Sequence, residues 1–382
     1  MERRLITTDC HIAPPYSLIE QLPEQYREHF PRLDRRADGT YLVQPRSAMM
    51  AALMMEVDSE GVEVDDDPVS LARRAVNNVC AEATPSFDPV EQLADLERDG
   101  VYGAVLISRI HAFDPSTPLD VDIAYCQVVN DWLAETWGPH LDRTAPGFVL
   151  PYRDVAASVK EFERAAAMGL RPALLPEAVH DRPYHLAEWE PLWEIAHSLR
   201  VPFTMHVGSS ATVNPPKGQE FSVFPGIADL SWYSLCCSMG MTLGYLTYNG
   251  MFEKYPDLHV VMTEGYAGWF GFMIQFLDHH WSDSRLHSLS IGNTPGSAKI
   301  DAPPSVYLKR QAHATFMWDP IAIRNRDVTG IDSLMWGNDY PHMEGAFPFS
   351  QEWVDKQFAG VPEDEIDMMV RGNAAQLFGI SV

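Results

Sequence analysis

Acidic side chains and imidazoles occur in three short segments that lie far apart in the chain. They are Asp9 and His11 in TTDCHI, His206 in TMHVGSS, and Asp339 in MWGNDYPH. Each segment lies at the end of a short apolar run rich in strand-forming residues. Asp9 and His11 are separated by one residue, so on a strand they point to the same side and can share one ion. We therefore predict that these four side chains bind a divalent metal ion.

The types of these side chains restrict the metal and its chemistry. A catalytic metal needs three or four protein ligands and a free position for water or substrate. Carboxylate and imidazole ligands without a thiolate favour Zn²⁺, with Mn²⁺ as the alternative, and they are also compatible with Fe²⁺. The ion could lower the pKa of a bound water to about 7, or it could hold a substrate carboxylate or phenolate as a Lewis acid. The sequence leaves both roles open.

Two further residues, with Asp339, are candidates for proton transfer. Glu264 follows the run LHVVMT and could carry a proton or bind the metal; the alternative is a carboxylate at a helix N-terminus. A glutamic acid that donates a proton at pH 7 must be desolvated, so this role predicts a raised pKa. His342 lies three residues after Asp339 and is a candidate acid or base, with a surface turn as the other interpretation.

Candidate substrate-binding residues also lie near predicted strand ends. Arg109 and Arg153 could each pair with a substrate carboxylate, although arginines of a barrel commonly form structural ion pairs. Trp269 and Trp336 could wall a pocket for an aromatic substrate, or they could belong to the core.

Strand-like runs alternate with helix-like runs over most of the 382 residues. This alternation predicts an α/β fold, a (β/α)₈ TIM barrel, as one domain over residues 1–382. The strand-like runs are residues 4–8, 102–107, 147–150, 171–175, 202–206, 259–263, 314–318 and 333–337. The helix-like runs are residues 88–99, 120–137, 155–168, 186–199, 230–252, 265–281, 320–329 and 363–378.

Three longer stretches exceed a minimal barrel. Residues 30–79, after the first strand, are charged and rich in methionine, and we expect them to form a cap. Residues 209–229, after the fifth strand, are rich in Gly, Pro and Ser, and 282–304 form a third excursion. Long loops after barrel strands commonly carry lids or subunit contacts.

Composition excludes several classes of partner. The formal net charge of −25 and pI near 4.8 argue against nucleic acid and against an anionic membrane surface. No apolar stretch approaches the ~20 residues of a membrane span, and we see no targeting segment. The five cysteines show no CxxC spacing and are typical of reduced thiols, so we expect a cytoplasmic protein.

Several of these segments resemble one enzyme family. TTDCHI, TMHVG, LMWGNDYPHMEG, PSVYLKRQAHATF and NAAQLFGI resemble segments of the amidohydrolase-related family of TIM-barrel metal enzymes. The resemblance is to the branch that includes aminocarboxymuconate semialdehyde decarboxylase and γ-resorcylate decarboxylase. It implies metal ligands at Asp9, His11, His206 and Asp339, and a homodimer. One position departs from the pattern, because Glu264 stands where decarboxylases of this branch usually carry a histidine.

Our leading hypothesis is a metal-dependent, non-oxidative decarboxylase of a small aromatic or enol-type carboxylic acid. The metal would chelate the substrate, and Glu264 or His342 would deliver a proton to the carbon that loses CO₂. The alternative enzyme is a metal-dependent hydrolase of an amide, lactone or ester, which uses metal-bound hydroxide. A barrel without catalysis, serving as a scaffold, is the third hypothesis and predicts no stoichiometric metal.

Overall fold

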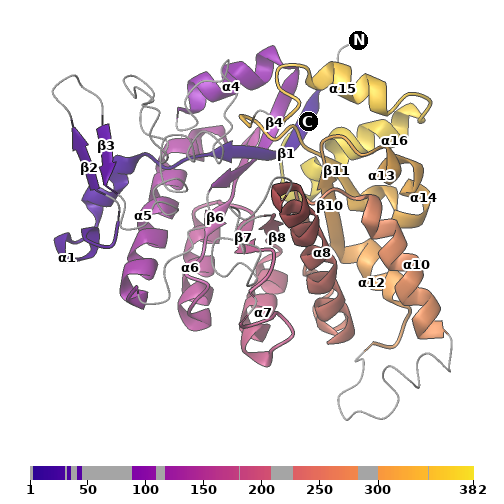
Figure 1. Ribbon diagram of the computed structural model, residues 1–382, viewed down its shortest axis with the longest axis horizontal. Helices are drawn as coiled ribbons and strands as arrows, with labels where there is room; N and C mark the ends of the chain where they lie inside the picture. Colours follow the sequence, from indigo (N-terminus) through magenta and orange to yellow (C-terminus); the bar gives the residue numbers. More distant parts are fainter. Residues whose placement is uncertain are drawn as a thin grey trace.

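A computed structural model describes residues 3–30, 32–35, 41–44, 88–108, 117–179, 181–207, 227–282, 300–342 and 344–382. Its central feature is a set of parallel strands surrounded by helices (Figure 1). The strands are β1 (Leu5–Ile12), β4 (Val101–Ser108), β5 (Thr144–Pro146), β6 (Phe148–Val149), β7 (Ala173–Pro176), β8 (Phe203–His206), β9 (Val260–Thr263), β10 (Ala312–Phe316) and β11 (Leu334–Trp336). The eight predicted strands are all present. The third, predicted at residues 147–150, corresponds to β6, and β5 precedes it at residues that were not predicted as strand.

Hydrogen bonds lead from each strand to the next around a closed ring. Parallel ladders join β1, β4 and β5, and a second series runs from β6 to β11 in chain order. Gly147 connects β5 to β6, and its N–H donates to the carbonyl of Leu106 at 2.8 Å. A parallel bridge between Cys10 and Tyr340 returns the ring to β1. The fold is therefore the predicted (β/α)₈ barrel.

Gly147 is needed at the junction of β5 and β6. A Cβ atom at this position would lie 2.8 Å from the side chain of Leu174 and 2.9 Å from the carbonyl oxygen of Leu106. Only glycine allows the backbone to approach the neighbouring strands this closely.

Helices cover the outside of the ring. They include α4 (Pro89–Arg98), α5 (Leu119–Trp137), α6 (Val155–Ala167), α7 (Glu190–Leu199), α8 (Ile227–Tyr248), α9 (Met251–Lys254), α10 (Gly268–Ser282), α12 (Pro304–Gln311), α13 (Pro320–Arg324), α14 (Arg326–Thr329), α15 (Ser350–Gln357), α16 (Glu363–Asp367) and α17 (Asn373–Phe378). Asp88 is the N-cap of α4, and a carboxylate oxygen of Asp88 accepts from the N–H of Val90 at 2.8 Å.

Some elements differ from the predicted ones. The helices α12 and α15 were not expected from the sequence. The predicted helix 230–252 is divided at Gly250, which adopts a left-handed φ of 74° between α8 and α9. An antiparallel pair, β2 (Arg32–Arg35) and β3 (Tyr41–Gln44), lies within the predicted cap. Most of the predicted cap, and most of the excursions 209–229 and 282–304, lie outside the described residues.

The core fills the barrel and the layer between strands and helices. The strands are buried along nearly their whole length, as in β4, where only Tyr102 is partly exposed. Strands buried on both faces need apolar side chains at successive positions, which explains runs such as AVLI within β4. Among the described residues, no helix is both long and apolar enough to cross a bilayer.

Candidate metal centre

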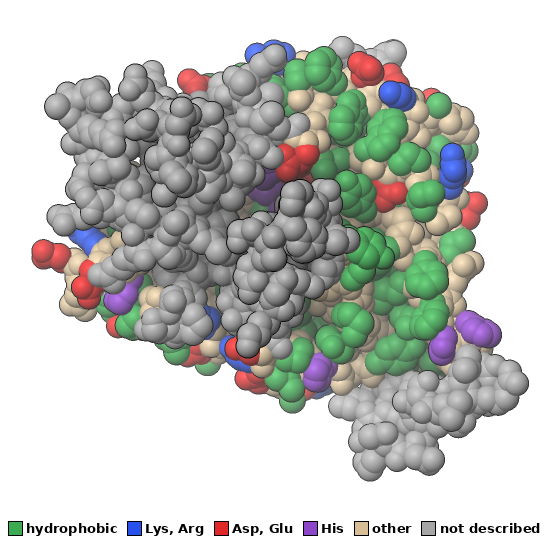
Figure 2. All heavy atoms as spheres, viewed as in Figure 1, with side chains coloured by type: hydrophobic (Ala, Val, Ile, Leu, Met, Phe, Trp, Pro, Cys, Tyr) green, Lys and Arg blue, Asp and Glu red, His purple; other side chains and the backbone are tan. Residues whose placement is uncertain are grey.

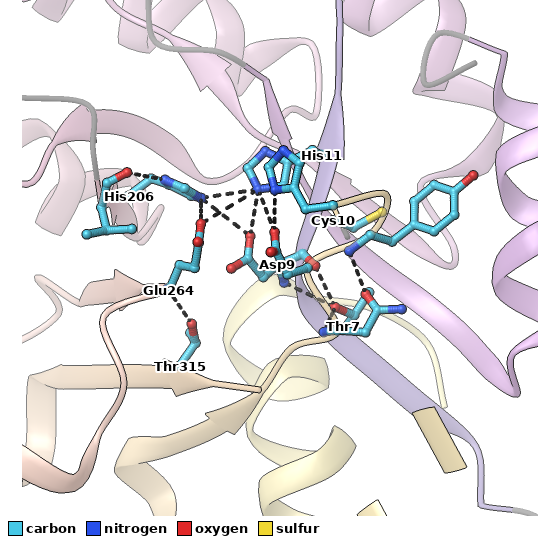
Figure 3. Close-up of polar contacts among 12 residues, drawn as sticks. Thr7, Asp9, Cys10, His11, His206, Glu264 and Thr315 are labelled. Atoms are coloured by element: carbon cyan, nitrogen blue, oxygen red, sulfur yellow. Dashed lines mark hydrogen bonds and ion pairs between the residues drawn. The ribbon is translucent and has the colours of Figure 1, made fainter. Parts of the chain in front are cut away.

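Polar side chains converge at the C-terminal ends of four barrel strands. They come from β1, from the end of β8, and from the segments that follow β9 and β11 (Figure 3). In parallel barrels this is the face on which active sites are built. The six side chains that meet here are Asp9, His11, His206, Glu264, Asp339 and His342.

Asp9 and His11 are brought together by an irregular stretch of β1. The register of β1 on β4 shifts between Thr7 and Cys10, as in a β-bulge. The hydroxyl of Thr7 donates to the carbonyl of Asp9 at 2.8 Å and accepts from the N–H of Asn338 at 2.9 Å. In this arrangement Nε2 of His11 lies 3.4 Å from Oδ1 of Asp9. The spacing of the two residues did predict a shared site, but the bulge and Thr7 define its geometry.

His206 has its ring orientation and tautomer set by the backbone. Its Nδ1 lies 2.6 Å from the carbonyl oxygen of Val207, and since a carbonyl only accepts, Nδ1 must carry the hydrogen. In a neutral ring this leaves a lone pair on Nε2, which lies 3.3 Å from Nε2 of His11. Two ring nitrogens at this distance attract each other only when a proton or a cation lies between them.

Asp339 faces His11 from the segment after β11. Its Oδ1 lies 3.1 Å from Nε2 of His11 and 2.8 Å from Nδ1 of His342. Its N–H donates to the carbonyl of Asp9 at 2.9 Å, which ties this segment to β1. Asp339 adopts a φ of 54°, a left-handed conformation that is uncommon outside glycine and recurs at functional sites.

Glu264 follows β9 and also adopts a left-handed φ, of 62°. Its N–H donates to the hydroxyl of Thr315 on β10 at 3.0 Å. Its Oε2 lies 3.0 Å from Nε2 of His206 and 4.0 Å from Nε2 of His11. Glu264 therefore contacts the imidazoles directly and is not only a carboxylate near a helix N-terminus.

Asp319 holds the segment that follows Glu264. Its Oδ2 accepts from the N–H groups of Ala267 and Gly268, both at 2.8 Å. Its Oδ1 accepts from the N–H groups at the start of α13, at 3.1 and 2.9 Å. One carboxylate thus satisfies backbone donors at the beginnings of α10 and α13 and fixes the loop that carries Glu264.

Burial and mutual contacts shift the pKa values of these groups. Burial alone would lower the pKa of His11, but hydrogen bonds with Asp339 and Asp9 raise it to about 9. Burial also opposes the charge on His206, yet contacts with Asp9 and Glu264 raise its pKa well above the usual value. Burial, with the nearby charge of Asp339, raises the pKa of Glu264 to about 7.

The donor set fits a divalent cation. Two groups of four side chains each place one ligand atom per residue within 4.8 Å of the others: Asp9, His11, His206 and Glu264, and His11, Glu264, Asp339 and His342. The four predicted ligands are divided between these groups, and Glu264 belongs to both. Within the part of the chain that the structure describes, Oδ2 of Asp339 is buried without a hydrogen-bond partner, as expected for an atom that a cation would satisfy. Oδ1 of Asp9 is buried with only longer contacts, 3.4 Å to Nε2 of His11 and 3.6 Å to Nε2 of His206.

The predicted substrate-binding residues lie in different environments. Arg109 lies outside the described residues. Trp336 on β11 is fully buried, so its ring has no exposed surface here. The indole of Trp269 donates to the carbonyl of Gly265 at 2.8 Å, and its ring lies near Gly240 of α8. Arg153 donates to the carbonyl of Thr117 at 2.8 Å. The structure brings none of the three described side chains, Arg153, Trp269 and Trp336, into the cluster, and the roles of all four residues stay predictions.

Three residues that support the site were missed or left undecided by the sequence analysis. Thr7 and Thr315 act through hydroxyls that hold Asp9, Asn338 and Glu264. The pattern Asp319-Pro320 is typical of a helix N-cap, and from the sequence Asp319 could equally be a residue of the site. Thr7 contacts Asn338, Thr315 contacts Glu264, and Asp319 contacts Ala267 and Gly268 across long stretches of sequence, so no spacing along the chain reveals these contacts.

The chain was then compared with known proteins. The family model described as Amidohydrolase matches residues 6–380. The 5-carboxyvanillate decarboxylase of Sphingomonas paucimobilis has 19% identity and a TM-score of 0.68, with 99% of each chain covered. An amidohydrolase of Mycobacterium avium subsp. paratuberculosis K-10 has 16% identity and a TM-score of 0.69, with 99% of this chain and 100% of that chain covered.

A third similar structure carries a metal and an inhibitor. It is the dihydroxybenzoic acid decarboxylase of Polaromonas sp. JS666, with bound manganese and 2-nitroresorcinol. It has 16% identity and a TM-score of 0.64, and 99% of this chain and 97% of that chain are covered. At such identities the likeness establishes a common fold.

Proposed function

The chain belongs to the amidohydrolase family of enzymes, and on that premise we propose that it is a metal-dependent decarboxylase of a small aromatic or enol-type carboxylic acid. The proposed metal ligands are Asp9, His11, His206 and Asp339. A single divalent cation would occupy the centre, Zn²⁺ first and Mn²⁺ as the alternative.

The observation that carries the proposal is the place of Glu264 at this centre. Its carboxyl group lies 3.0 Å from Nε2 of His206, is mostly buried, and has its pKa raised to about 7. A carboxyl group in this condition can hold a proton near neutral pH and pass it to a substrate. His342, against Asp339, is the second candidate acid.

The cation and the side chains would have different roles in the reaction. When bound, a divalent cation supplies a Lewis acid for the substrate carboxylate and a neighbouring oxygen. The bond between the ring carbon and the carboxylate carbon breaks, CO₂ leaves, and the electron pair stays on the ring carbon. Glu264 then delivers its proton to that carbon and becomes a carboxylate beside the cation.

The comparisons support this choice of reaction. Two of the similar structures are decarboxylases of substituted aromatic acids, and one of them holds manganese with an aromatic inhibitor. In such barrels active sites are built at the C-terminal ends of the strands, which is where the cluster described above lies. This likeness favours an aromatic carboxylate as the substrate class, and the particular acid is left to experiment.

One observation favours a second candidate function, hydrolysis of an amide, lactone or ester. The residue after the sixth barrel strand is Glu264, where the resemblance leads us to expect histidine. A carboxylate beside the metal centre could take a proton from an attacking water. The same ligands would serve both reactions, and only the products differ.

The test is product analysis with metal-loaded protein. The chain is incubated with Zn²⁺ or Mn²⁺ and a panel of hydroxybenzoates, including 2,6-dihydroxybenzoate and 5-carboxyvanillate, in D₂O. We expect release of CO₂ and one deuterium at the carbon that lost it. Hydrolysis of lactones or amides without any CO₂ release would support the second candidate. Neither reaction, in protein that retains no metal, would support the scaffold hypothesis.

A further inference from the structure

The inner side of α4 carries polar residues where a helix packed on a barrel usually presents apolar ones. Gln92, Asp95 and Asp99 are spaced three and four residues apart, so they lie on one side of the helix. Acidic and basic side chains are usually found at the molecular surface, as Figure 2 shows for one face of this molecule. Here the exposed fractions are 0% for Gln92, 5% for Asp95 and 4% for Asp99. We call these three residues the α4 polar face.

Gln92 holds the end of β1. Its Nε2 donates to the carbonyl oxygen of His11 at 3.0 Å and lies 3.2 Å from Sγ of Cys10. Cys10 stands between the proposed ligands Asp9 and His11 in the chain, and its side chain points away from the cluster (Figure 3). Gln92 therefore contacts β1 from outside the cluster. It fixes a segment whose register on β4 is irregular between Thr7 and Cys10.

The two carboxylates of the α4 polar face contact the residues on either side of Asp339. Oδ2 of Asp95 accepts from the hydroxyl of Tyr340 at 2.8 Å. Oδ2 of Asp99 accepts from Nδ2 of Asn338 at 3.4 Å. Asn338 and Tyr340 thus direct their side chains to α4, while Asp339 between them faces the cluster. Both neighbours of this proposed ligand are therefore held by one helix.

Asp99 has a further contact with the same part of the chain. Its Oδ1 accepts from the N–H of Ser350 at 2.9 Å, and its Oδ2 accepts from the hydroxyl of Ser350. The N–H of Ala346 donates to the carbonyl of Asn338 at 2.8 Å, which keeps the segments before and after it close together. Asp99 therefore contacts the chain both before and after Asp339.

These contacts are unfavourable for the helix itself. Asp99 ends α4, where the partial negative charge of a helix C-terminus opposes a carboxylate. Burial also raises the pKa of Asp99, although hydrogen bonds from Ser350 and Asn338 oppose the rise. Replacing both partners of a buried hydrogen bond by apolar groups of the same shape is often nearly neutral for stability. The α4 polar face therefore indicates a role other than the stability of the helix.

The segments that the α4 polar face contacts meet where the barrel closes. Between β1 and β11, which are both fully described, there is no ladder, and the bridge between Cys10 and Tyr340 links the two segments. Asp339 adopts a left-handed φ of 54°, a conformation that costs free energy and persists only when its surroundings hold it. A proposed ligand in such a conformation, beside a junction without a ladder, needs support from outside the sheet.

We propose that the α4 polar face positions His11 and Asp339 for metal binding by holding the backbone on which they lie. This inference rests on the metal centre of the proposed function. The three residues are positioning residues, because their side chains contact backbone groups or neighbouring side chains and not the ligand atoms. Outer partners of metal ligands typically contribute about 10–100-fold to metal affinity. Removal of one contact should therefore weaken metal binding without removing a ligand.

The experiment titrates the metal-free chain with Mn²⁺ and follows the free ion by electron paramagnetic resonance. Tyr340→Phe removes only the hydroxyl that donates to Asp95, and Gln92→Met removes the donor to β1 at similar volume. We expect each variant to weaken Mn²⁺ binding about 10-fold. Tyr307→Phe is the matched control and should bind like the wild type. It deletes a hydroxyl of α12, also on a buried side chain, that accepts from the N–H of Ala302 at 3.0 Å.

A third variant separates the hydrogen bond from the charge. Asp95→Asn removes a negative charge but keeps an oxygen that can accept from Tyr340, so it should bind Mn²⁺ like the wild type. Urea unfolding of the metal-free chains measures the loss of stability in Tyr340→Phe and Tyr307→Phe. A merely structural role would produce this loss in both variants and would leave the Mn²⁺ affinity unchanged.

Two results would overturn the inference, and they can be told apart. Unchanged Mn²⁺ affinity in both Tyr340→Phe and Gln92→Met, with a wild type that binds the ion, would refute the role of the α4 polar face alone. A wild type that binds no Mn²⁺ would refute the proposed metal centre and this inference with it.

Discussion

The Nε2 atom of His206 lies 3.0 Å from Oε2 of Glu264, which joins the ends of the fifth and sixth barrel strands. The other ring nitrogen of His206, Nδ1, donates its hydrogen to the carbonyl of Val207. The ring therefore faces the cluster with Nε2 only. Glu264 is equally constrained, by its hydrogen bond to Thr315 and by the loop that Asp319 holds. The proposed metal ligand and the proposed proton carrier are thus positioned independently by neighbouring strands.

Substitution of Glu264 should separate catalysis from metal binding. We expect Glu264→Gln to keep the shape of the side chain, to retain stoichiometric metal, and to lower the turnover number at least about 100-fold. The activity measured is whichever of CO₂ release or hydrolysis the wild type shows. Loss of metal together with activity would instead identify Glu264 as a ligand, and full activity would remove it from the mechanism.

His206 should matter for the metal itself. Partners of a metal ligand already contribute about 10–100-fold to affinity, so removal of a ligand in His206→Ala should weaken metal binding at least about 100-fold. Titration of the metal-free chain with Mn²⁺ measures this. His280→Ala, on α10 outside the cluster, is the control and should bind like the wild type. Equal affinity in both variants would contradict the proposed ligand set.

Asp319 should act on the site through the loop after Glu264. Asp319→Ala leaves backbone donors of two helices without an acceptor, so we expect a loss of about 2–4 kcal/mol in the free energy of unfolding. The turnover number should fall as well. Asp154→Ala removes the cap of α6, where the carboxylate accepts from the N–H of Ala157 at 3.0 Å, and should cost about 1 kcal/mol with unchanged turnover. Equal turnover in the two variants would show that the loop does not depend on Asp319.

The stability of the fold should fall in acid because of a histidine outside the site. His313 on β10 is buried, and burial together with the nearby His259 lowers its pKa to about 3. Below about pH 6.5 the unfolded chain therefore binds a proton that the folded chain does not. This group contributes stability that is present above pH 6.5 and is lost as the pH falls, by up to about 1.4 kcal/mol per pH unit.

Urea unfolding of the wild type and of His313→Asn at pH 7, 6 and 5 checks this. The wild type should be the more stable at pH 7, and the difference should shrink as the pH falls. Parallel pH dependence in the two chains would refute the assignment to His313.

The strands and helices that were predicted correctly are those that a short stretch of sequence defines by its own residue pattern. The run VYGAVLIS predicts β4, and DPVEQLADLER predicts α4 with its cap. The helices α12 and α15 were missed because each has only eight residues and shows little more than two turns of apolar spacing.

The same distinction applies to the candidate site. Asp9 and His11 are close in sequence and could be grouped directly, and the strand ends suggested the other ligands. The roles of Thr7, Thr315 and Asp319 depend on hydrogen bonds to residues up to 331 positions away, such as that from Asn338 to Thr7. Only the closed barrel brings these partners together, so no local pattern could predict them.

The central claim is that one divalent cation is held by Asp9, His11, His206 and Asp339. An anomalous difference map from crystals grown with Mn²⁺ tests it most directly. We predict one peak per chain, with ligand atoms from all four residues at about 2.0–2.3 Å. A map with no peak at this place, or with a peak bound by other residues, would contradict the account.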